Sequence, residues 1–253
     1  MPTLENYKAE APIKGILIGD TGSGKTGALA SLANAGYHLH ILDFDNGLDV
    51  LSNTVKPDCL KNVEFEHFID KKKALPNGTI VPDGMPKAFP AALKTLTEWC
   101  NKYTSLTDVI VIDSLTFLGD ATLDYVVASA GRQGQQPQLQ DWGIAMARIE
   151  DILSLLYSTD VKANVLVLAH IKYLEDELTG SIKAQVNALG RALPPKIGRY
   201  FNTMLSAQLI GSARKLKTKA TAWLGLKSPN PAKVKDDYAV ETGLAEYFAD
   251  LKK

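Results

Sequence analysis

The octet Gly19–Thr26 (GDTGSGKT) carries the residue types that bind a nucleotide phosphate, in the pattern G-x-x-x-x-G-K-[ST]. Its glycines let the backbone adopt positive φ and approach an anion closely, so that successive N–H groups point at the phosphates. Lys25 would reach the β- and γ-phosphates, and the Thr26 hydroxyl would ligate Mg²⁺. The predicted nucleotide-binding residues are Gly19, Asp20, Thr21, Gly22, Ser23, Gly24, Lys25, Thr26 and Gly27.

The segments on either side of this octet are suited to hold it between a strand and a helix. The apolar run Ile16–Ile18 precedes it, and the helix-compatible sequence GALASLANAG follows it. A helix that begins at the loop adds its positive N-terminal end to the anion site. We therefore expect a strand over Lys14–Ile18 and a helix over Lys25–Ala35.

Asp113 is a second candidate for a nucleotide site. It follows Asp108–Ile112 (DVIVI), whose continuous apolar character is typical of a strand covered on both faces. A carboxylate at the end of such a strand would emerge beside the phosphate loop and hold Mg²⁺ through water, together with Thr26. An ordinary strand-end carboxylate that caps the next turn would look the same, and the phosphate loop favours the metal role.

Polar residues also end two other predicted strands. Asp43 and Asp45 lie at the end of Tyr37–Phe44, and His170 follows Asn164–Ala169. Ligands bind beyond the carboxyl ends of strands in an open parallel sheet. We assign Asp45 as the base that activates the attacking water, and His170 as a contact to the γ-phosphate. The simpler alternatives are that the sequence DNG is only a turn and that His170 is structural.

The alternation of strand and helix patterns predicts an α/β fold with a mostly parallel sheet, in one domain over residues 1–253. Residues 12–226 would form its core, and residues 227–253 a C-terminal tail. The further expected elements are an edge strand at Asn62–Phe68, a loop or hairpin at 71–86, helices at Phe89–Tyr103, Leu115–Ala130 and Trp142–Tyr157, strands at Tyr200–Leu209 and Thr218–Leu226 joined by the basic turn GSARKLK, and a short helix at Gly243–Leu251. The segments 131–141 and 171–197 are expected to be irregular.

Composition narrows the class of protein. The chain has no net charge, 45% hydrophobic residues and two isolated cysteines, Cys59 and Cys100, which read as reduced thiols. The N-terminal segment shows no apolar signal-peptide core, and no apolar stretch is long enough to span a membrane. From Ile171 to Lys235 there are twelve Lys or Arg and three acids, which fits either a polyanion-binding face or a solvated basic surface.

Together these segments resemble the RecA-like ATPase core. DVIVIDSLTFL resembles its Walker B segment, LDFDNGLD the segment with the catalytic carboxylate, and VLVLAHIK the sensor strand before the second DNA-binding loop. More narrowly, the chain resembles the small phage ATPases that act as single-strand annealing proteins. The resemblance implies a sheet order of 5-1-4-3-2 with helices on both faces and a C-terminal antiparallel extension.

The resemblance also implies an activity and its partners. ATP and Mg²⁺ would be the cofactors, and hydrolysis would be stimulated by single-stranded DNA, which the protein would bind as a ring or filament of identical subunits. Such a protein would act in recombination or strand annealing in the host cytoplasm, away from membranes. The core lacks the N-terminal polymerisation segment and C-terminal domain of full recombinases, so annealing is favoured over strand invasion.

Two loops would face DNA if the resemblance holds. Residues 131–141 would form the first loop and residues 171–190 the second. Amide, basic and aromatic side chains in them suit contacts to phosphates and bases without strong sequence choice. The candidates are Arg132, Gln133, Gln135, Gln136, Gln138, Lys172, Tyr173 and Lys183. The acidic stretch Glu175–Glu177 is unfavourable for such a role, and both loops read equally well as generic surface.

In RecA-like assemblies a cation from the neighbouring subunit completes the nucleotide site. Lys215 and Lys217 in the basic turn match that position, and three other cations are rivals for it. The simpler alternative is that the basic turn is only a solvated hairpin tip. The rivals are Arg191, Lys196 and Arg199. Asp45 and His170 stand where RecA itself has Glu and Gln, and the shorter carboxylate is expected to slow hydrolysis.

Other functions with the same core remain open. A nucleoside or nucleotide kinase would need a substrate pocket and usually an Arg-rich lid, whereas residues 131–141 hold one Arg and several Gln. A ring helicase or motor would use the same ATPase core, which the sequence does not separate from annealing. A nucleotide-gated switch would show almost no turnover.

Overall fold

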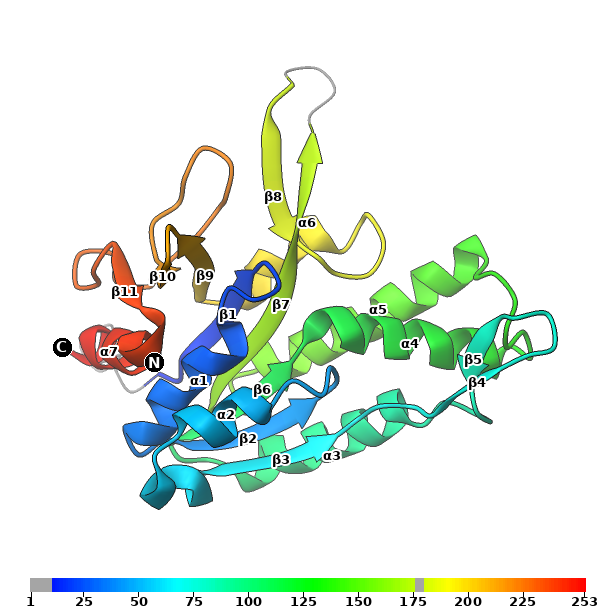
Figure 1. Cartoon of the computed structure of the whole chain (residues 1–253), viewed down its shortest axis with the longest axis horizontal. Helices are drawn as coiled ribbons and strands as arrows, with labels where there is room; N and C mark the ends of the chain where they lie inside the picture. The colour runs from blue at the N-terminus through cyan, green and yellow to red at the C-terminus, as the bar shows by residue number, and fades with distance from the viewer. Residues whose placement is uncertain (1–10, 176–179) are drawn as a thin grey trace, which may run out of the picture.

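The computed structural model describes residues 11–175 and 180–253 and shows an α/β fold with a mostly parallel central sheet (Figure 1). The strands are β1 (Lys14–Gly19), β2 (His38–Asp43), β3 (Val63–His67), β6 (Asp108–Asp113), β7 (Asn164–Glu175), β8 (Ile182–Val186), β9 (Thr203–Ile210), β10 (Ala213–Lys217) and β11 (Asp237–Ala239). Their order is β11-β10-β9-β1-β7-β6-β2-β3, with β8 paired to β7. The pairs from β9 to β3 are parallel, whereas β10 and β11 form the expected antiparallel extension.

Helices cover both faces of this sheet. The longer ones are α1 (Lys25–Asn34), α3 (Ala88–Lys102), α4 (Leu115–Ser129), α5 (Leu139–Tyr157) and α7 (Val240–Lys252). Alternate strand residues divide between two cores: Ile110 and Ile112 of β6 pack with α3, α4 and α5, whereas Val109 and Val111 pack with α1 and α7. This alternation explains why the central strands are continuous apolar runs, because both of their faces are buried.

The short elements occupy the edges of the fold. They are α2 (Asp49–Thr54), η1 (Pro57–Asn62), β4 (Lys72–Ala74), β5 (Ile80–Pro82), α6 (Pro194–Ile197) and η2 (Gly198–Tyr200). Strands β4 and β5 form an antiparallel hairpin, as expected within residues 71–86. Helix α5 begins at Leu139, earlier than the expected Trp142, because Gln138 and Asp141 form a capping box there.

Two expectations about local structure are wrong. The segment 171–197 is not irregular throughout: β7 continues to Glu175 and pairs with β8, and this hairpin projects from the body of the molecule (Figure 1). Thr218–Leu226 is not the strand after β9. Ala213–Lys217, within the expected basic turn GSARKLK, forms β10 instead and pairs with β9. Trp223 of the segment 218–226 instead contacts the hairpin, where Ala184 N donates a 2.8 Å hydrogen bond to Trp223 O.

The C-terminal segment after residue 226 packs deeply into the fold. Leu244, Tyr247 and Phe248 of α7 are fully buried against α1. Strand β11 pairs with β10 and so extends the sheet. Residues 1–10, which bear on the question of a signal peptide, and Asp176 and Glu177 of the acidic stretch lie outside the described residues.

Candidate functional site

The phosphate loop lies between β1 and α1, as its sequence context predicts. Gly22 and Gly24 adopt positive φ of 76° and 95°, conformations that other L-residues rarely adopt. A Cβ atom at Gly19 would lie 2.5 Å from Ala207 O, so only glycine fits against β9. The loop therefore uses its glycines for the close turns that an anion-binding backbone needs.

The Lys25 side chain is directed back into this loop. Its Nζ atom donates hydrogen bonds to Gly19 O at 3.0 Å and Asp20 O at 2.9 Å. Burial lowers its pKa, and the nearby carboxylates of Asp113 and Asp45 oppose that shift. The ammonium group is thus held over the loop, where the phosphates of a bound nucleotide would replace part of its lost hydration.

Thr26 and Asp113, the two predicted magnesium ligands, lie together in the site. Thr26 Oγ1 donates a 2.8 Å hydrogen bond to Asp113 Oδ2, although 87 residues separate them. Asp113 is 1% exposed, and burial, with the charges of Asp45 and Asp43, raises the pKa of its carboxyl to about 7. A cation bound at this point would favour the ionised carboxylate.

Asp43 and Asp45 have different roles at the end of β2. The buried Asp43 lies beside Asp113 in the sheet, and its Oδ1 accepts bonds from the N–H groups of Asp45 and Asn46 at 3.3 and 3.0 Å. His67 Nδ1 lies 2.6 Å from the other carboxylate oxygen of Asp43, an ion-pair distance without hydrogen-bond geometry. Asp43 therefore fixes the turn that presents Asp45.

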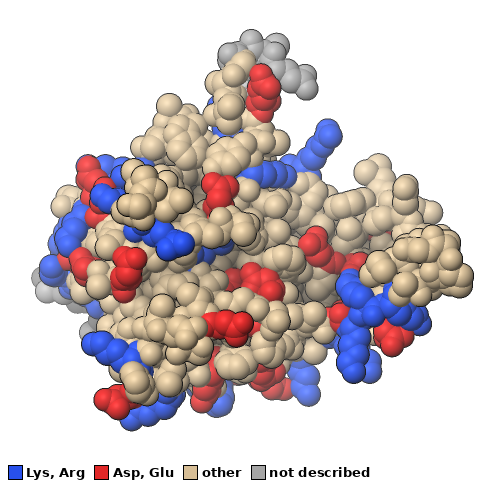
Figure 2. Space-filling view, viewed as in Figure 1, with Lys and Arg blue, Asp and Glu red and all other residues tan. Residues whose placement is uncertain are grey.

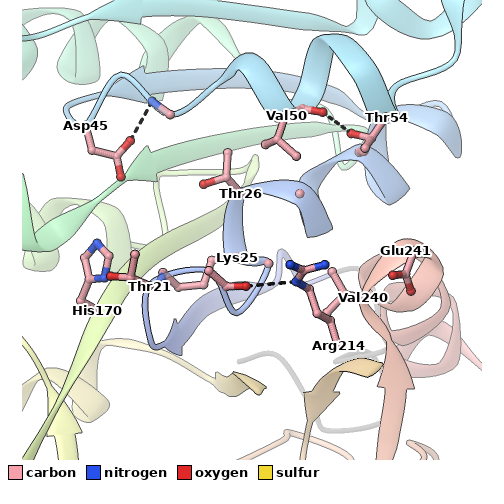
Figure 3. A pocket seen from close by; sticks show the side chains of 15 residues that line it. Thr21, Lys25, Thr26, Asp45, Val50, Thr54, His170, Arg214, Val240 and Glu241 are labelled. Carbon is pink, nitrogen blue, oxygen red and sulfur yellow. Dashed lines mark hydrogen bonds between the residues drawn. The ribbon is translucent and has the colours of Figure 1, made fainter. Parts of the chain in front are cut away.

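Asp45 lines the cavity over the phosphate loop (Figure 3). Its Oδ1 accepts a 3.1 Å bond from Gly47 N, so the expected DNG turn exists and the carboxylate still reaches the cavity. Burial, and then the charge of Asp43, raises its pKa. A raised pKa moves a carboxylate towards the range in which it can accept a proton from water. The assignment of Asp45 as the base stays a prediction.

His170 lies on β7 directly beside Gly19 of β1. Its backbone N–H donates to Thr116 Oγ1 at 3.1 Å, and its ring meets Phe117 edge-on with centroids 5.9 Å apart. Burial and the Lys25 charge lower its pKa, so the imidazole is neutral near pH 7. Its ring lines the cavity opposite Asp45, and its contact with a γ-phosphate stays a prediction.

One cavity of about 570 Å³ joins these groups. Asp45 and His170 lie at one end of it, the phosphate loop lies along its floor, and α2 and α7 flank the other end (Figure 3). This size and this mixture of apolar and polar walls are typical of a nucleotide pocket. The lining residues are Thr21, Gly22, Gly24, Lys25, Thr26, Gly27, Ala30, Asp45, Gly47, Val50, Thr54, His170, Arg214, Val240 and Glu241.

Sequence reasoning missed several of these lining residues. Arg214 Nε donates a 3.0 Å hydrogen bond to Gly22 O, so β10 supports the phosphate loop from the same subunit. Val240 and Glu241 come from α7, which the sequence placed in a tail. Arg214 lies in the same basic turn as Lys215 and Lys217. Because this turn is a strand, alternate side chains face opposite ways, and of these three only Arg214 points to the phosphate loop.

The side chains at the loop fit a Mg²⁺–nucleotide. The buried hydroxyl oxygens of Ser23 and Ser114 have no hydrogen-bond partner among the described residues, and these serines lie close in sequence to Thr26 and Asp113. Within residues 11–175 and 180–253, no three His, Cys, Asp or Glu side chains gather as a complete metal cage. Mg²⁺ commonly takes one or two protein ligands and fills the rest of its shell with phosphate and water oxygens, which matches Thr26 and Asp113.

The first candidate DNA loop is partly engaged within the chain. Arg132 forms a bidentate ion pair with buried Asp141, and Gln133 Nε2 donates to Pro82 O and Gly84 O. These contacts tie the loop to the β4–β5 hairpin and to α5. Gln133, Gln135, Gln136 and Gln138 are all exposed, and of these Gln135 and Gln136 make no side-chain hydrogen bond to another described residue. Contacts of this loop with DNA stay a prediction.

The second candidate loop is replaced by the β7–β8 hairpin. Tyr173 is half exposed, its OH donates a 2.8 Å bond to Asp20 Oδ2 of the phosphate loop, and its ring lies 6.3 Å from that of Trp223. Lys172 Nζ lies 3.4 Å from Gly190 O, and Lys183 is exposed on β8. Tyr173 of the hairpin and Trp223 of the segment beside β8 therefore form an aromatic pair, and Tyr173 is hydrogen-bonded to the phosphate loop.

The trans-acting candidates have partners in their own chain. Lys215 and Lys217 each lie 3.0 Å from a carboxylate oxygen of Asp237, on the face of β10 opposite Arg214. Lys196 and Arg199 both pair with Glu150, and Arg191 is exposed. A role in a neighbouring subunit would require Lys215 or Lys217 to leave Asp237, and it stays a prediction.

Part of the basic window, residues 171–235, is paired with acids that follow it in the sequence. Asp236 pairs with Lys219, Asp237 with Lys215 and Lys217, and Glu246 with Lys235. On the face shown in Figure 2, blue and red side chains are interspersed, and the projecting hairpin is mostly uncharged. Any nucleic-acid contact of this hairpin would thus depend on stacking more than on a broad basic face.

A family model described as an AAA domain matches residues 11–223. The match includes the phosphate loop, Asp45, Asp113 and His170. No curated protein gives a significant match to the chain. Among the described residues, no helix is both long and apolar enough to cross a membrane.

Proposed function

Because the chain belongs to the AAA domain family and is a P-loop ATPase-type domain, we propose that it is a Mg²⁺-dependent ATPase with a RecA-like core. The strand sequence β9-β1-β7-β6-β2 supports the RecA-like part, since it is the order 5-1-4-3-2 that the resemblance implies. The Thr26–Asp113 bond and the cavity from Asp45 to Glu241 support Mg²⁺ and nucleotide binding.

In this proposal the residues of the site divide the work of hydrolysis. The loop backbone and Lys25 bind the phosphates, and Thr26 and Asp113 hold Mg²⁺, which neutralises phosphate charge when bound. Asp45 orients the attacking water and accepts its proton, and His170 contacts the terminal phosphate from β7. Asp43 keeps Asp45 in place through the backbone bonds of the turn.

We further propose that the protein binds single-stranded DNA and acts in annealing or recombination. The observation that carries this step is the Tyr173–Asp20 hydrogen bond, which joins the projecting hairpin to the phosphate loop. Tyr173 and Trp223 are both accessible and form a tilted aromatic pair on which a base can stack. Binding of DNA at the hairpin would therefore alter the loop that holds the nucleotide.

Binding to a labelled single-stranded oligonucleotide, followed by fluorescence anisotropy with and without Mg–ATP, tests this step. Trp223→Ala is expected to weaken binding about tenfold, since stacking on an aromatic side chain contributes about 1–3 kcal/mol per base. Tyr157→Ala removes an exposed aromatic ring from α5, away from the hairpin, and should have no effect. No binding under any nucleotide condition would refute the DNA role, and annealing of complementary strands is the next assay.

A kinase is the second candidate, and one observation favours it. A cavity of about 330 Å³ adjoins the nucleotide site and is lined by Asp20, Thr21, Thr116, Phe117, His170, Ile171 and Asn187. Thr21 and His170 line both cavities, so a small phosphoryl acceptor in the second cavity would lie next to the phosphate end of the nucleotide site. ATP turnover that is insensitive to DNA and rises with added nucleosides or nucleotides would favour the kinase over the DNA-dependent ATPase.

A further inference from the structure

The position of the phosphate-binding residues indicates which end of the cavity would hold the nucleobase, and we call this the base end. Lys25, Thr26, Asp45 and His170 gather where the terminal phosphate and its cation would lie. A nucleotide bound in this orientation must extend its base towards the opposite end, between α2 and the first turn of α7 (Figure 3). This inference rests on the proposed nucleotide-hydrolysing function and concerns which base enters the site.

Apolar side chains form the two walls of the base end. A Cβ at Gly27 would lie 3.6 Å from Val50 of α2, and a Cβ at Gly24 would lie 3.1 Å from Val240 of α7. Val50 and Val240 thus flank the beginning of α1 from two different elements. A planar base fits between such walls, which exclude water from its two faces.

Three polar side chains lie near this end of the cavity. Arg214 donates from Nε to Gly22 O of the phosphate loop, whereas Thr54 and Glu241 offer hydrogen-bond acceptors. Thr54 Oγ1 donates its hydrogen to Val50 O at 2.7 Å, which leaves only the lone pairs of the hydroxyl for a ligand. Glu241 lines the cavity, and an ionised carboxylate only accepts hydrogen bonds. A base that presents an amino group here would be matched, and one that presents a carbonyl oxygen would be repelled.

Glu241 differs from the acids around it in having no hydrogen-bond or ion-pair partner for its carboxylate among the described residues. Asp237 binds Lys215 and Lys217, and Glu246 binds Lys235 and Thr242. Within the part of the chain that the structure describes, no side chain or backbone N–H donates to the Glu241 carboxylate. An acid in the first turn of a helix also stabilises that helix, which gives Glu241 a purely structural alternative.

We propose that Glu241 is a specificity-determining residue that accepts a hydrogen bond from the 6-amino group of adenine and disfavours 6-oxopurines. Losing a hydrogen bond to a charged group typically weakens binding about tenfold or more, and a 6-oxopurine cannot donate this bond from position 6. The wild-type protein should therefore bind ADP at least about tenfold more tightly than inosine diphosphate or guanosine diphosphate.

Calorimetric titration of these three diphosphates in the presence of Mg²⁺ tests the proposal without requiring turnover. In Glu241→Gln, whose amide can donate to a 6-oxo group, the preference for ADP over inosine diphosphate should fall to about twofold. Glu246→Gln removes an equal charge from the same helix outside the nucleotide cavity and should keep the wild-type ratio.

Several results would overturn the assignment. These are equal binding of ADP and inosine diphosphate by the wild type, a preference for guanosine diphosphate, or a Glu241→Gln variant that weakens all three equally and only lowers Tm. If Lys25→Ala abolishes ATP turnover while Glu241→Gln leaves the base preference unchanged, the ATPase stands and the Glu241 assignment fails. If no diphosphate binds, both fail.

Discussion

Thr26 Oγ1 donates a 2.8 Å hydrogen bond to Asp113 Oδ2 and so joins the first turn of α1 to the end of β6. Strand β7 lies between β1 and β6, so this contact crosses above one intervening strand. The hydrogen bond holds the two oxygens together, so a cation that bound both, as proposed, would require little rearrangement of these side chains.

Replacing Asp113 by Asn should change how the stability of the nucleotide-free protein depends on pH. The ordinary pKa of 3.8 applies to the unfolded chain and a pKa of about 7 to the folded protein. Below 3.8 both states are protonated, so the group contributes nothing. Between 3.8 and 7 the unfolded state loses its proton first, and the folded state loses about 1.4 kcal/mol per pH unit. Above about 7 the full cost is present.

The Asp113→Asn variant should therefore gain stability relative to wild type as pH rises from about 4 to about 7, with a constant difference above that. Thermal unfolding of both proteins across this range at fixed ionic strength measures the difference. Parallel Tm curves would contradict the raised pKa. The same variant should lose Mg²⁺-dependent nucleotide binding, which separates the metal role from the stability effect.

The Asp45→Asn variant should bind ATP and lose hydrolysis. The amide keeps the size of the side chain, and it cannot take a proton from water. Loss of a general base typically lowers a rate by about 10²–10⁴-fold. Single-turnover hydrolysis and nucleotide titration measure the two properties separately. Equal losses in both would mean that Asp45 acts in binding, and an unchanged rate would leave it only a turn residue.

Tyr173→Phe should keep the aromatic surface and remove the hydrogen bond to Asp20. If the bond transmits the state of the hairpin to the phosphate loop, stimulation of ATP turnover by single-stranded DNA should fall about fivefold, which corresponds to about 1 kcal/mol of coupling. DNA affinity should change little, because the ring remains. Tyr157→Phe on α5 is the matched control, and an unaltered DNA response in Tyr173→Phe would show that the bond carries no coupling.

Arg214→Ala should weaken nucleotide binding from within the same subunit. The side chain donates a 3.0 Å bond to Gly22 O, and its Cδ lies 2.9 Å from the position that a Cβ on Gly24 would take. Loss of a charged hydrogen bond to the loop is expected to lower ATP affinity about tenfold. Lys219→Ala removes an equal charge at an exposed pair with Asp236 and should bind normally. Equal affinities in the two variants would exclude Arg214 from the loop's support.

The sequence was sufficient for the parts of the fold that local pattern determines. The continuous apolar strand before Asp113 and the glycines of the phosphate loop correspond to buried strands and positive φ angles in the structure. Both features depend on residues adjacent in the chain, so spacing alone predicts them. The placement of Asp45 and His170 around one cavity also followed, because parallel strands bring their carboxyl ends to one edge.

The errors arose where tertiary contacts decide. The segment 218–226 has β-forming residues, but Trp223 attaches to β8 while Ala213–Lys217 takes the place beside β9. The sequence left open whether the basic window 171–235 is a polyanion-binding face or a solvated surface, because the acids that pair with part of it, Glu150, Asp236, Asp237 and Glu246, lie outside it in the chain. Glu241 enters the cavity only because α7 packs on α1, a contact between segments some two hundred residues apart that no local pattern contains.

The central claim is a nucleotide site whose hydrolysis responds to single-stranded DNA. The most direct measurement is steady-state ATP turnover by the wild type and by Lys25→Ala, each with and without single-stranded DNA. We expect low basal turnover in the wild type, a rise on adding DNA, and no turnover above background in Lys25→Ala under either condition. Wild-type turnover that persists in Lys25→Ala, or that is the same with and without DNA, would contradict it.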